Sequence, residues 1–302
     1  ITRASLIERL APNWAGPYIR MARLDRPLGT WLLLFPRWWS MVLALPYATI
    51  PSEMTPIWYA TLFAIGAVIM RGAGCTINDI LDRDLDAQVV RTRTRPLPAG
   101  EVSVKQALAF VVIQALIGFA VLVQFSVQTI TIGVMSLALV VTYPLMKRIT
   151  FWPQLFLGLT FNWGALVGWV AMTGNLSWPT LLLYAGGVFW TLGYDTIYAY
   201  QDRADDLEVG VKSSAIRLGD AAPFWIGFSY LITWGCWATA IYWASGSDLV
   251  SVLYIAPVAL HFIWQISSWQ VANTASSLAI FKSNRWVGWL MLIGVAASIA
   301  PA

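Results

Sequence analysis

Residues 106–146 read QALAFVVIQALIGFAVLVQFSVQTITIGVMSLALVVTYPLM, and they contain no Asp, Glu, Lys or Arg. The stretch is long enough for two membrane crossings of roughly 20 residues each, joined at 126–128. A surface helix of a soluble protein keeps a charged face, whereas these segments are apolar on all sides. The stretch therefore predicts two transmembrane helices.

The same pattern extends over the whole chain. Of its 302 residues, 58% are hydrophobic and 11% charged, and the mean hydropathy is +0.65; soluble domains carry about 25% charged residues. We expect an all-α integral membrane protein, a bundle of nine transmembrane helices that forms a single domain over 1–302. The expected spans lie near 27–47, 57–78, 106–125, 129–147, 154–173, 180–200, 222–244, 249–268 and 286–301.

The basic residues predict the topology. All but Arg37 and Arg71 of the 19 Lys and Arg residues precede the first expected span or lie in connections on that same side. The opposite connections, near 48–56, 126–128, 174–179 and 245–248, contain none. The positive-inside rule then places the basic loops in the cytoplasm, or in the matrix of a mitochondrion. This distribution argues against a nucleic-acid partner.

The acidic residues are concentrated in two short segments. Four of the 15 lie in 79–86 and five lie in 195–208. Residues three, four and seven apart share a helix face, which predicts two polar stripes. The first stripe comprises Asn78, Asp79, Asp82 and Asp86; the second comprises Asp195, Asp202 and Asp206, with Asp205 beside Asp202. Stacked carboxylates repel one another unless a cation binds them, and oxygen-only ligands favour Mg²⁺, Mn²⁺ or Ca²⁺.

Three other interpretations compete with metal binding at these segments. A solvated acidic loop explains neither the shared spacing nor the placement on one side of the membrane. A calcium-binding EF-hand loop starting at Asp82 fails, because Ala87 and Arg93 occupy the positions that need Gly and Glu. An ion or proton pathway in a secondary transporter is the runner-up from a different functional class.

Basic residues follow both acidic segments. Arg91, Arg93 and Arg95 come after the first, and Lys212 comes after the second. Lys147 ends an expected span on the same side. Positive-inside loops need such residues in any case, but acids facing cations also suit a diphosphate that is bridged by metal and clamped by Lys and Arg.

At these residues the sequence resembles the UbiA superfamily of membrane prenyltransferases, and within it the enzymes that prenylate 4-hydroxybenzoate in ubiquinone biosynthesis. The resemblance rests on NDILDRDLD at 78–86, RTRTRPL at 91–97, YDTIYAYQDRADD at 194–206 and GVKS at 210–213. A weaker match is RLDRPLGTW at 23–31. Because the resemblance is greatest to proteobacterial members, we expect a bacterial inner membrane first and a mitochondrial inner membrane second.

The resemblance implies an enzyme with a central cavity, open to the bilayer, that transfers a polyprenyl group from a polyprenyl diphosphate to an aromatic acid. It implies Mg²⁺ as cofactor. The same chemistry on homogentisate, a naphthoate, haem or a fungal polyketide acid is the alternative. The metal ligands would come from Asn78, Asp79, Asp82, Asp86, Asp202, Asp205 and Asp206, and the diphosphate cations from Arg91, Arg95, Lys147 and Lys212.

Further candidates concern the reacting groups. Asp195 is a candidate base, and Tyr143, Tyr194 and Tyr198 are candidates for facing an allyl cation. Arg71 lies inside a span, seven residues before Asn78 on the same stripe, so it is the first candidate for an acceptor carboxylate. Arg23 and Arg26 are alternatives. His261, the single histidine, is expected to pack within its span.

Overall fold

The computed structural model describes residues 6–50, 55–89 and 92–300, and these contain helices and turns but no strand. The expected all-α class is confirmed. The chain divides into two compact units. The first combines residues up to Thr30 with Leu62–Gln124, and the second combines Trp31–Thr61 with the rest of the chain from Phe125. The expectation of a single domain stays a prediction.

The first unit holds the amino-terminal helices and most of the first acidic helix. Its elements are α1 (Leu6–Leu10), η1 (Asn13–Ala15), α2 (Gly16–Met21), the start of α3 (Leu28–Leu43), most of α4 (Pro56–Asp86) and α5 (Val104–Leu122). Ser103 and Gln106 form a reciprocal capping box that starts α5. Glycines let α4 and α5 approach closely: a Cβ on Gly118 would lie 2.5 Å from Met70 Sδ.

Helix α4 is unusually long. Its 31 residues correspond to about 46 Å, whereas the hydrocarbon core of a bilayer is roughly 30 Å thick. The apolar part ends near Ile77, so the polar turns from Asn78 to Asp86 extend the helix beyond the predicted span.

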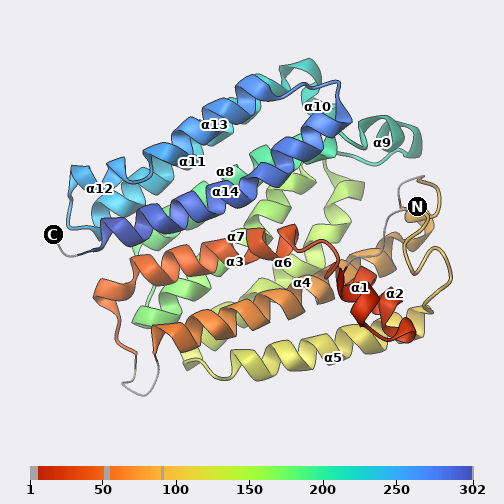
Figure 1. Ribbon diagram of the computed structural model, residues 1–302, viewed down its shortest axis with the longest axis horizontal. Helices are drawn as coiled ribbons and strands as arrows, with labels where there is room; N and C mark the ends of the chain where they lie inside the picture. Colours follow the sequence, from red (N-terminus) through yellow and green to blue (C-terminus); the bar gives the residue numbers. More distant parts are fainter. Residues whose placement is uncertain (1–5, 51–54, 90–91, 301–302) are drawn as a thin grey trace. The chain divides into compact units, whose positions relative to one another are not determined.

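The second unit is built on helices that lie side by side, coloured from green to blue in Figure 1. Neighbouring pairs are α6 with α7, α7 with α8, α8 with α11 and α14, and α13 with α11 and α14. The bounds are α6 (Val127–Ile149), α7 (Pro153–Thr173), α8 (Trp178–Ala199), α11 (Ala222–Ala244), α12 (Leu249–Leu253), α13 (Ala256–Ser268) and α14 (Thr274–Ser298). The short elements are η2 (Leu45–Tyr47), α9 (Arg203–Val209), α10 (Ser214–Leu218) and η3 (Gly219–Ala221).

Three tryptophans form the centre of the second unit. Trp39 of α3, Trp190 of α8 and Trp237 of α11 are fully buried, and their ring centroids lie 5.0–5.7 Å apart. The indole of Trp39 also donates a hydrogen bond to the carbonyl oxygen of Gly288 on α14. Aromatic packing therefore joins α3, α8, α11 and α14.

Six helical segments of the described chain are long and apolar enough to cross a membrane, which supports a multi-pass membrane protein. They are Pro56–Asp86, Val104–Leu122, Val127–Ile149, Pro153–Thr173, Ser214–Ala244 and Leu249–Ser268. The expected count of nine is not confirmed. Helices α3, α8 and α14 occupy the other three expected ranges, and α3, with 16 residues, is shorter than a typical span.

The expected span at 249–268 is not one uninterrupted helix. It divides into α12 and α13 at Tyr254 and Ile255. Pro257 lies in the first turn of α13, where a missing N–H does no harm. The helix therefore restarts at the proline instead of continuing through it.

Candidate active site

The carboxyl-terminal turns of α4 carry the first acidic stripe, as the spacing predicted. Asn78 is half-buried, while Asp79 and Asp82 are each 1% exposed and Asp86 is 8% exposed. Asp84 points away from this stripe and is exposed. A helix face with three enclosed carboxylates requires compensating positive charge, because burying an uncompensated charge is strongly unfavourable.

Arg23 supplies part of that charge. Its Nη2 atom donates to both oxygens of Asp79, at 2.7 and 2.9 Å. Arg23 follows α2 and adopts a positive φ of 56°, which is uncommon for a residue with a Cβ. Its Nη1 atom donates to the carbonyl oxygen of Arg20 at 2.6 Å. The end of α2 thus directs the Arg23 guanidinium onto α4.

Arg95 supplies further positive charge, to Asp79 and Asp86. Its Nη1 atom lies 3.1 Å from Asp79 Oδ1 and 2.6 Å from Asp86 Oδ2, so one nitrogen links the two carboxylates. The loop that carries Arg95 is tied to α4, since Thr92 Oγ1 donates to the carbonyl oxygen of Asp86 at 2.9 Å. Arg91, the other predicted cation of this loop, lies outside the described residues.

A small apolar cluster holds the Arg95 loop in place. Leu97 and Val102 of the loop are buried with Met21 of α2 and Ala107 of α5, and Ile80 of α4 packs against them. This packing holds the loop, α2, α4 and α5 together. The burial of these apolar side chains therefore fixes the backbone positions from which Arg23 and Arg95 extend toward the acidic stripe.

Arg71 lies two turns before the stripe on α4. Its Nη1 atom donates to Cys75 Sγ, and the guanidinium occupies the space beside Gly29, where a Cβ would lie 2.5 Å from Nε. Arg26, an alternative for the acceptor carboxylate, instead pairs with Asp25 at 3.2 Å, and its side chain is 66% exposed. Arg23, by contrast, contacts the acidic stripe through its ion pair with Asp79.

The second acidic segment does not form the expected continuous stripe. Helix α8 ends at Ala199 and α9 begins at Arg203, with Asp202 at its N-cap. The expectation that Asp195, Asp202 and Asp206 share one helix face is therefore wrong. Asp205 and Asp206 lie in the first turn of α9, where the helix dipole favours negative charge. Asp195, Asp202, Asp205 and Asp206 are half-buried, whereas Glu208 is exposed.

The loop after α9 joins Lys212 to the end of α6. The main-chain N–H of Lys212 donates to the carbonyl oxygen of Lys147 at 3.0 Å, and Lys212 Nζ donates to the carbonyl oxygen of Ile149 at 3.1 Å. The main chains of Lys147 and Lys212 are thus in direct contact. The sequence alone had linked the two lysines only because both were candidates for binding the diphosphate.

Gln154 is a residue of this region that the sequence pattern did not predict. It is 5% exposed, and its Oε1 atom accepts a hydrogen bond from the Ser214 main-chain N–H at 3.1 Å. Ser214 and Thr196 share a hydroxyl hydrogen bond of 2.6 Å, which joins α10 to α8. The sequence feature that could have indicated Gln154 is a polar side chain directly after Pro153, at the start of an apolar span.

The predicted aromatic candidates pack against other residues. The Tyr198 ring lies 4.3 Å from that of Phe281, and Tyr194, which is 1% exposed, accepts a hydrogen bond from Thr191. Tyr143 is half-buried on α6. His261 stacks on Trp264 with ring centroids 5.1 Å apart, in keeping with the expected packing role.

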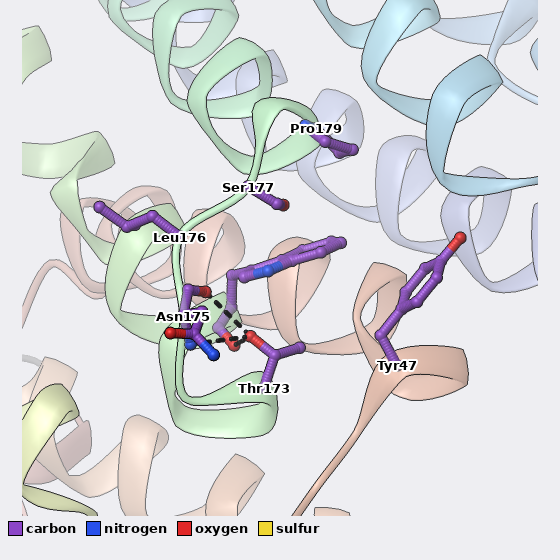
Figure 2. A pocket seen from close by; sticks show the side chains of 7 residues that line it. Tyr47, Thr173, Asn175, Leu176, Ser177 and Pro179 are labelled. Carbon is purple, nitrogen blue, oxygen red and sulfur yellow. Dashed lines mark hydrogen bonds between the residues drawn. The ribbon is translucent and has the colours of Figure 1, made fainter.

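A cavity of about 350 Å³ lies in the second unit, at the carboxyl-terminal end of α7. Tyr47, Trp169, Thr173, Asn175, Leu176, Ser177 and Pro179 line it, and Figure 2 shows it at the α7–α8 connection. Gln154 lies in the first turn of α7 and Thr173 ends the helix, and 21 residues of helix span about 30 Å. The cavity therefore belongs to the other end of the second unit from the Lys212 loop.

The donor atoms of the α4 stripe suit a hard divalent cation, because Asn78, Asp82 and Asp86 offer only oxygen. Among the described residues, no three His, Cys, Asp or Glu side chains converge as a ligand shell. Mg²⁺ commonly binds through one or two carboxylates and completes its shell with water and substrate phosphates. The stripe thus fits an ion that binds together with a phosphate ligand.

Comparison with known proteins supports this reading. The family model described as "UbiA prenyltransferase family" matches residues 33–293. The mitochondrial 4-hydroxybenzoate polyprenyltransferase of Drosophila pseudoobscura pseudoobscura is 46% identical over 96% of this chain and 72% of that protein. That of Arabidopsis thaliana is 43% identical over 98% and 72%. That of Aedes aegypti is 45% identical over 96% of this chain, which spans 64% of the insect protein.

Solved structures give the same fold. The apo UbiA homologue from Aeropyrum pernix K1 superposes with a TM-score of 0.70 at 26% identity, over 89% of this chain and 98% of that one. The Archaeoglobus fulgidus homologue bound to GPP and Mg²⁺ gives 0.71 at 17% identity, over 94% and 99%. Since the family model covers most of the sequence and the fly relative matches over most of both chains, this chain belongs to the UbiA prenyltransferase family.

Proposed function

We propose that this chain transfers a polyprenyl group from a polyprenyl diphosphate to the ring of 4-hydroxybenzoate in ubiquinone biosynthesis. The observation that carries the proposal is the contact of Asp79 and Asp86 with Arg23 and Arg95 at the end of α4. A site that combines carboxylates with guanidiniums suits a metal-bound diphosphate. The relatives named above carry this activity in their names.

The first step breaks the allylic C–O bond of the donor, and the diphosphate leaves with the electron pair. A divalent cation, Mg²⁺ in our proposal, would supply positive charge to offset the charge that develops on the departing oxygens. Asn78, Asp82 and Asp86 are assigned to hold it. Arg95 adds hydrogen bonds to the leaving group, because its guanidinium is 21% exposed and keeps further N–H donors.

The second acidic segment is assigned to the same polyprenyl diphosphate because it also combines carboxylates with nearby lysines. Asp202 and Asp206, with Asp205 beside them, are proposed to hold a second cation. Lys212 and Lys147 are proposed to stabilise the negative charge on the leaving diphosphate. Arg91 is proposed for the same role from sequence alone.

In the second step, the ring carbon ortho to the phenol forms a bond to the allylic carbon. The ring then loses the proton on that carbon and regains its aromaticity. Asp195 is our candidate for accepting the proton. The faces of Tyr143 and Tyr198 are candidates for stabilising the allyl cation, while the buried packing of Tyr194 argues for a structural role.

The acceptor carboxylate needs a cation of its own, and we assign Arg71 to it. Arg71 lies on α4, two turns before the acidic stripe, within an otherwise apolar part of the helix. Arg23 is less suitable than the sequence alone indicated, because Asp79 already accepts both of its hydrogen bonds from Nη2.

The membrane setting follows from the donor, whose polyprenyl chain is soluble in lipid while its diphosphate is not. The mitochondrial names of the relatives favour the mitochondrial inner membrane. A bacterial inner membrane and a cytoplasmic or matrix location of the basic loops remain predictions.

The test is transfer by purified full-length protein in nanodiscs, with one polyprenyl diphosphate and a panel of aromatic acids. Prenylated 4-hydroxybenzoate with release of diphosphate that depends on Mg²⁺ is the expected result. Turnover of another acid alone would move the proposal to that acceptor. Absence of diphosphate release with every acid would favour the transporter alternative.

A further inference from the structure

Asp79 of the α4 stripe is buried against two arginines. Its side chain is 1% exposed. Arg23 donates to both of its oxygens, and Arg95 donates to Oδ1 as well. We infer that Asp79 is a positioning residue that holds the Arg23 and Arg95 guanidiniums at the diphosphate site, and is not a metal ligand. This inference rests on the proposed function.

The charges around Asp79 argue against a metal there. Two guanidinium nitrogens lie within 3.1 Å of Oδ1, so a divalent cation on the same oxygen would lie very near two positive charges. Mg²⁺ also requires nearly ideal octahedral geometry around it. Asp79 is therefore better suited to binding arginines than to sharing a coordination sphere.

The backbone around Arg23 points to the same role. Arg23 has the left-handed φ of a residue that follows a helix, and the main-chain N–H of Leu24 reaches back to the carbonyl oxygen of Ile19 at 3.0 Å. Ala22 packs on α4 at Gly72, where an added Cβ would lie 3.1 Å from it. This close approach brings the end of α2 onto α4, two turns before Asp79.

This arrangement positions the side chain of Arg95. Its Nη1 atom is held between Asp79 and Asp86, at 3.1 and 2.6 Å. Anchoring one nitrogen leaves the remaining N–H groups of the planar guanidinium available to phosphate oxygens. When a cation binds Asp86, Asp79 still retains Arg95 beside the leaving group.

The test separates metal binding from donor binding in full-length protein in nanodiscs, without acceptor. The variants are Asp79→Asn and Asp82→Asn, with Asp84→Asn as the matched control, because Asp84 belongs to the same segment but its side chain is 84% exposed. Mn²⁺ affinity is measured by electron paramagnetic resonance at saturating polyprenyl diphosphate. Donor affinity is measured at saturating Mn²⁺.

Asp79→Asn should weaken donor binding at least tenfold and change the Mn²⁺ affinity less than threefold. Asp82→Asn should weaken Mn²⁺ binding more than tenfold, and Asp84→Asn should change neither. Asp79→Glu should restore most of the donor affinity. Arg23→Met should also weaken donor binding, and Asp79→Asn should cause a smaller loss in the Arg23→Met background than in the wild type, because only the contact with Arg95 remains to be lost. Arg23→Met serves as the test if Asp79→Asn does not fold.

A loss of Mn²⁺ affinity in Asp79→Asn equal to that in Asp82→Asn would overturn the inference, and so would unchanged donor affinity in both Asp79→Asn and Arg23→Met. Wild-type protein that binds neither probe would overturn it together with the proposed function. Wild-type protein that binds both probes but prenylates no aromatic acid would remove the proposed function alone.

Discussion

The main-chain N–H of Lys212 donates a hydrogen bond to the carbonyl oxygen of Lys147, 3.0 Å away. The bond joins the loop that follows the second acidic segment to the last turn of α6. Gln154 holds the next part of that loop by accepting the N–H of Ser214. Two cationic side chains are thereby kept on neighbouring parts of the backbone, which suits a shared polyanionic ligand.

The first prediction concerns Gln154. Gln154→Leu leaves the N–H of the fully buried Ser214 without its acceptor, which should lower the free energy of unfolding by about 1–3 kcal/mol. Because Lys212 lies two residues from Ser214, the KM for the polyprenyl diphosphate should rise several-fold while the KM for the acceptor stays nearly constant. Thermal denaturation and steady-state kinetics on one preparation measure both effects.

Gln114→Leu is the matched control for that variant. Gln114 is also buried, on α5, but its Oε1 atom accepts no hydrogen bond within the part of the chain that the structure describes. The same substitution there should change both the melting temperature and the donor KM less. Equal effects of the two variants would show that Gln154 acts through general packing.

The second prediction concerns the proposed metal ligands. Asp82→Asn and Asp206→Asn should each reduce kcat by at least a hundredfold, because the amide keeps the shape of the side chain and loses the charge that binds the cation. EDTA should abolish wild-type turnover and added Mg²⁺ should restore it. Circular dichroism checks that the variants remain folded, and full activity of either variant in excess Mg²⁺ would exclude that residue as a ligand.

The periodicity of the sequence was sufficient to predict the helices, but it did not predict where a helix is interrupted. The i, i+3 and i+4 spacing at Asp79, Asp82 and Asp86 correctly indicated one face, because α4 continues through all three. The same reasoning failed at Asp195 and Asp202, where α8 ends and a turn intervenes. The spacing of residues along the sequence indicates a shared helix face only within one continuous helix. Helix ends are the features that single-sequence patterns locate least reliably.

The ion-pair partners of the charged residues also could not be predicted from the sequence. The contact of Arg23 with Asp79 spans 56 positions, and it depends on Ala22 packing at Gly72. No local pattern indicates such a pair. The kinds of chemical group in the site were therefore predictable from the sequence, whereas tertiary packing decides which acid pairs with which arginine.

The third prediction tests the topology. In protein whose Cys75 and Cys236 are replaced by alanine, a cysteine at Asn175 should react with an impermeant thiol reagent added outside, and a cysteine at Ala99 should not. Both positions are exposed, so accessibility to solvent does not separate them. Inverted vesicles should give the opposite pattern. Labelling of Ala99→Cys from outside intact membranes would reverse the orientation inferred from the basic loops.

The last prediction concerns Arg71 and Gly29. If Arg71 binds the acceptor carboxylate, Arg71→Ala removes a charged pair from a partly dry site, which is worth about 2–5 kcal/mol, or a factor of roughly 30 to several thousand in affinity. The acceptor KM should rise accordingly, and the donor KM should change little. A purely structural arginine would instead lower the melting temperature and affect both substrates alike.

Gly29 offers a test that leaves the arginine in place. Gly29→Ala puts a Cβ 2.5 Å from Arg71 Nε, so the guanidinium must move and the acceptor KM should again rise. Gly74→Ala on α4 is the matched control, since nothing lies within 4 Å of the added carbon and alanine favours the helix by about 0.5–1 kcal/mol. An increased acceptor KM in Gly29→Ala but not in Gly74→Ala would tie the effect to the position of Arg71. If neither glycine variant changes that KM while Arg71→Ala does, the exact placement of the guanidinium beside Gly29 is not what the acceptor requires.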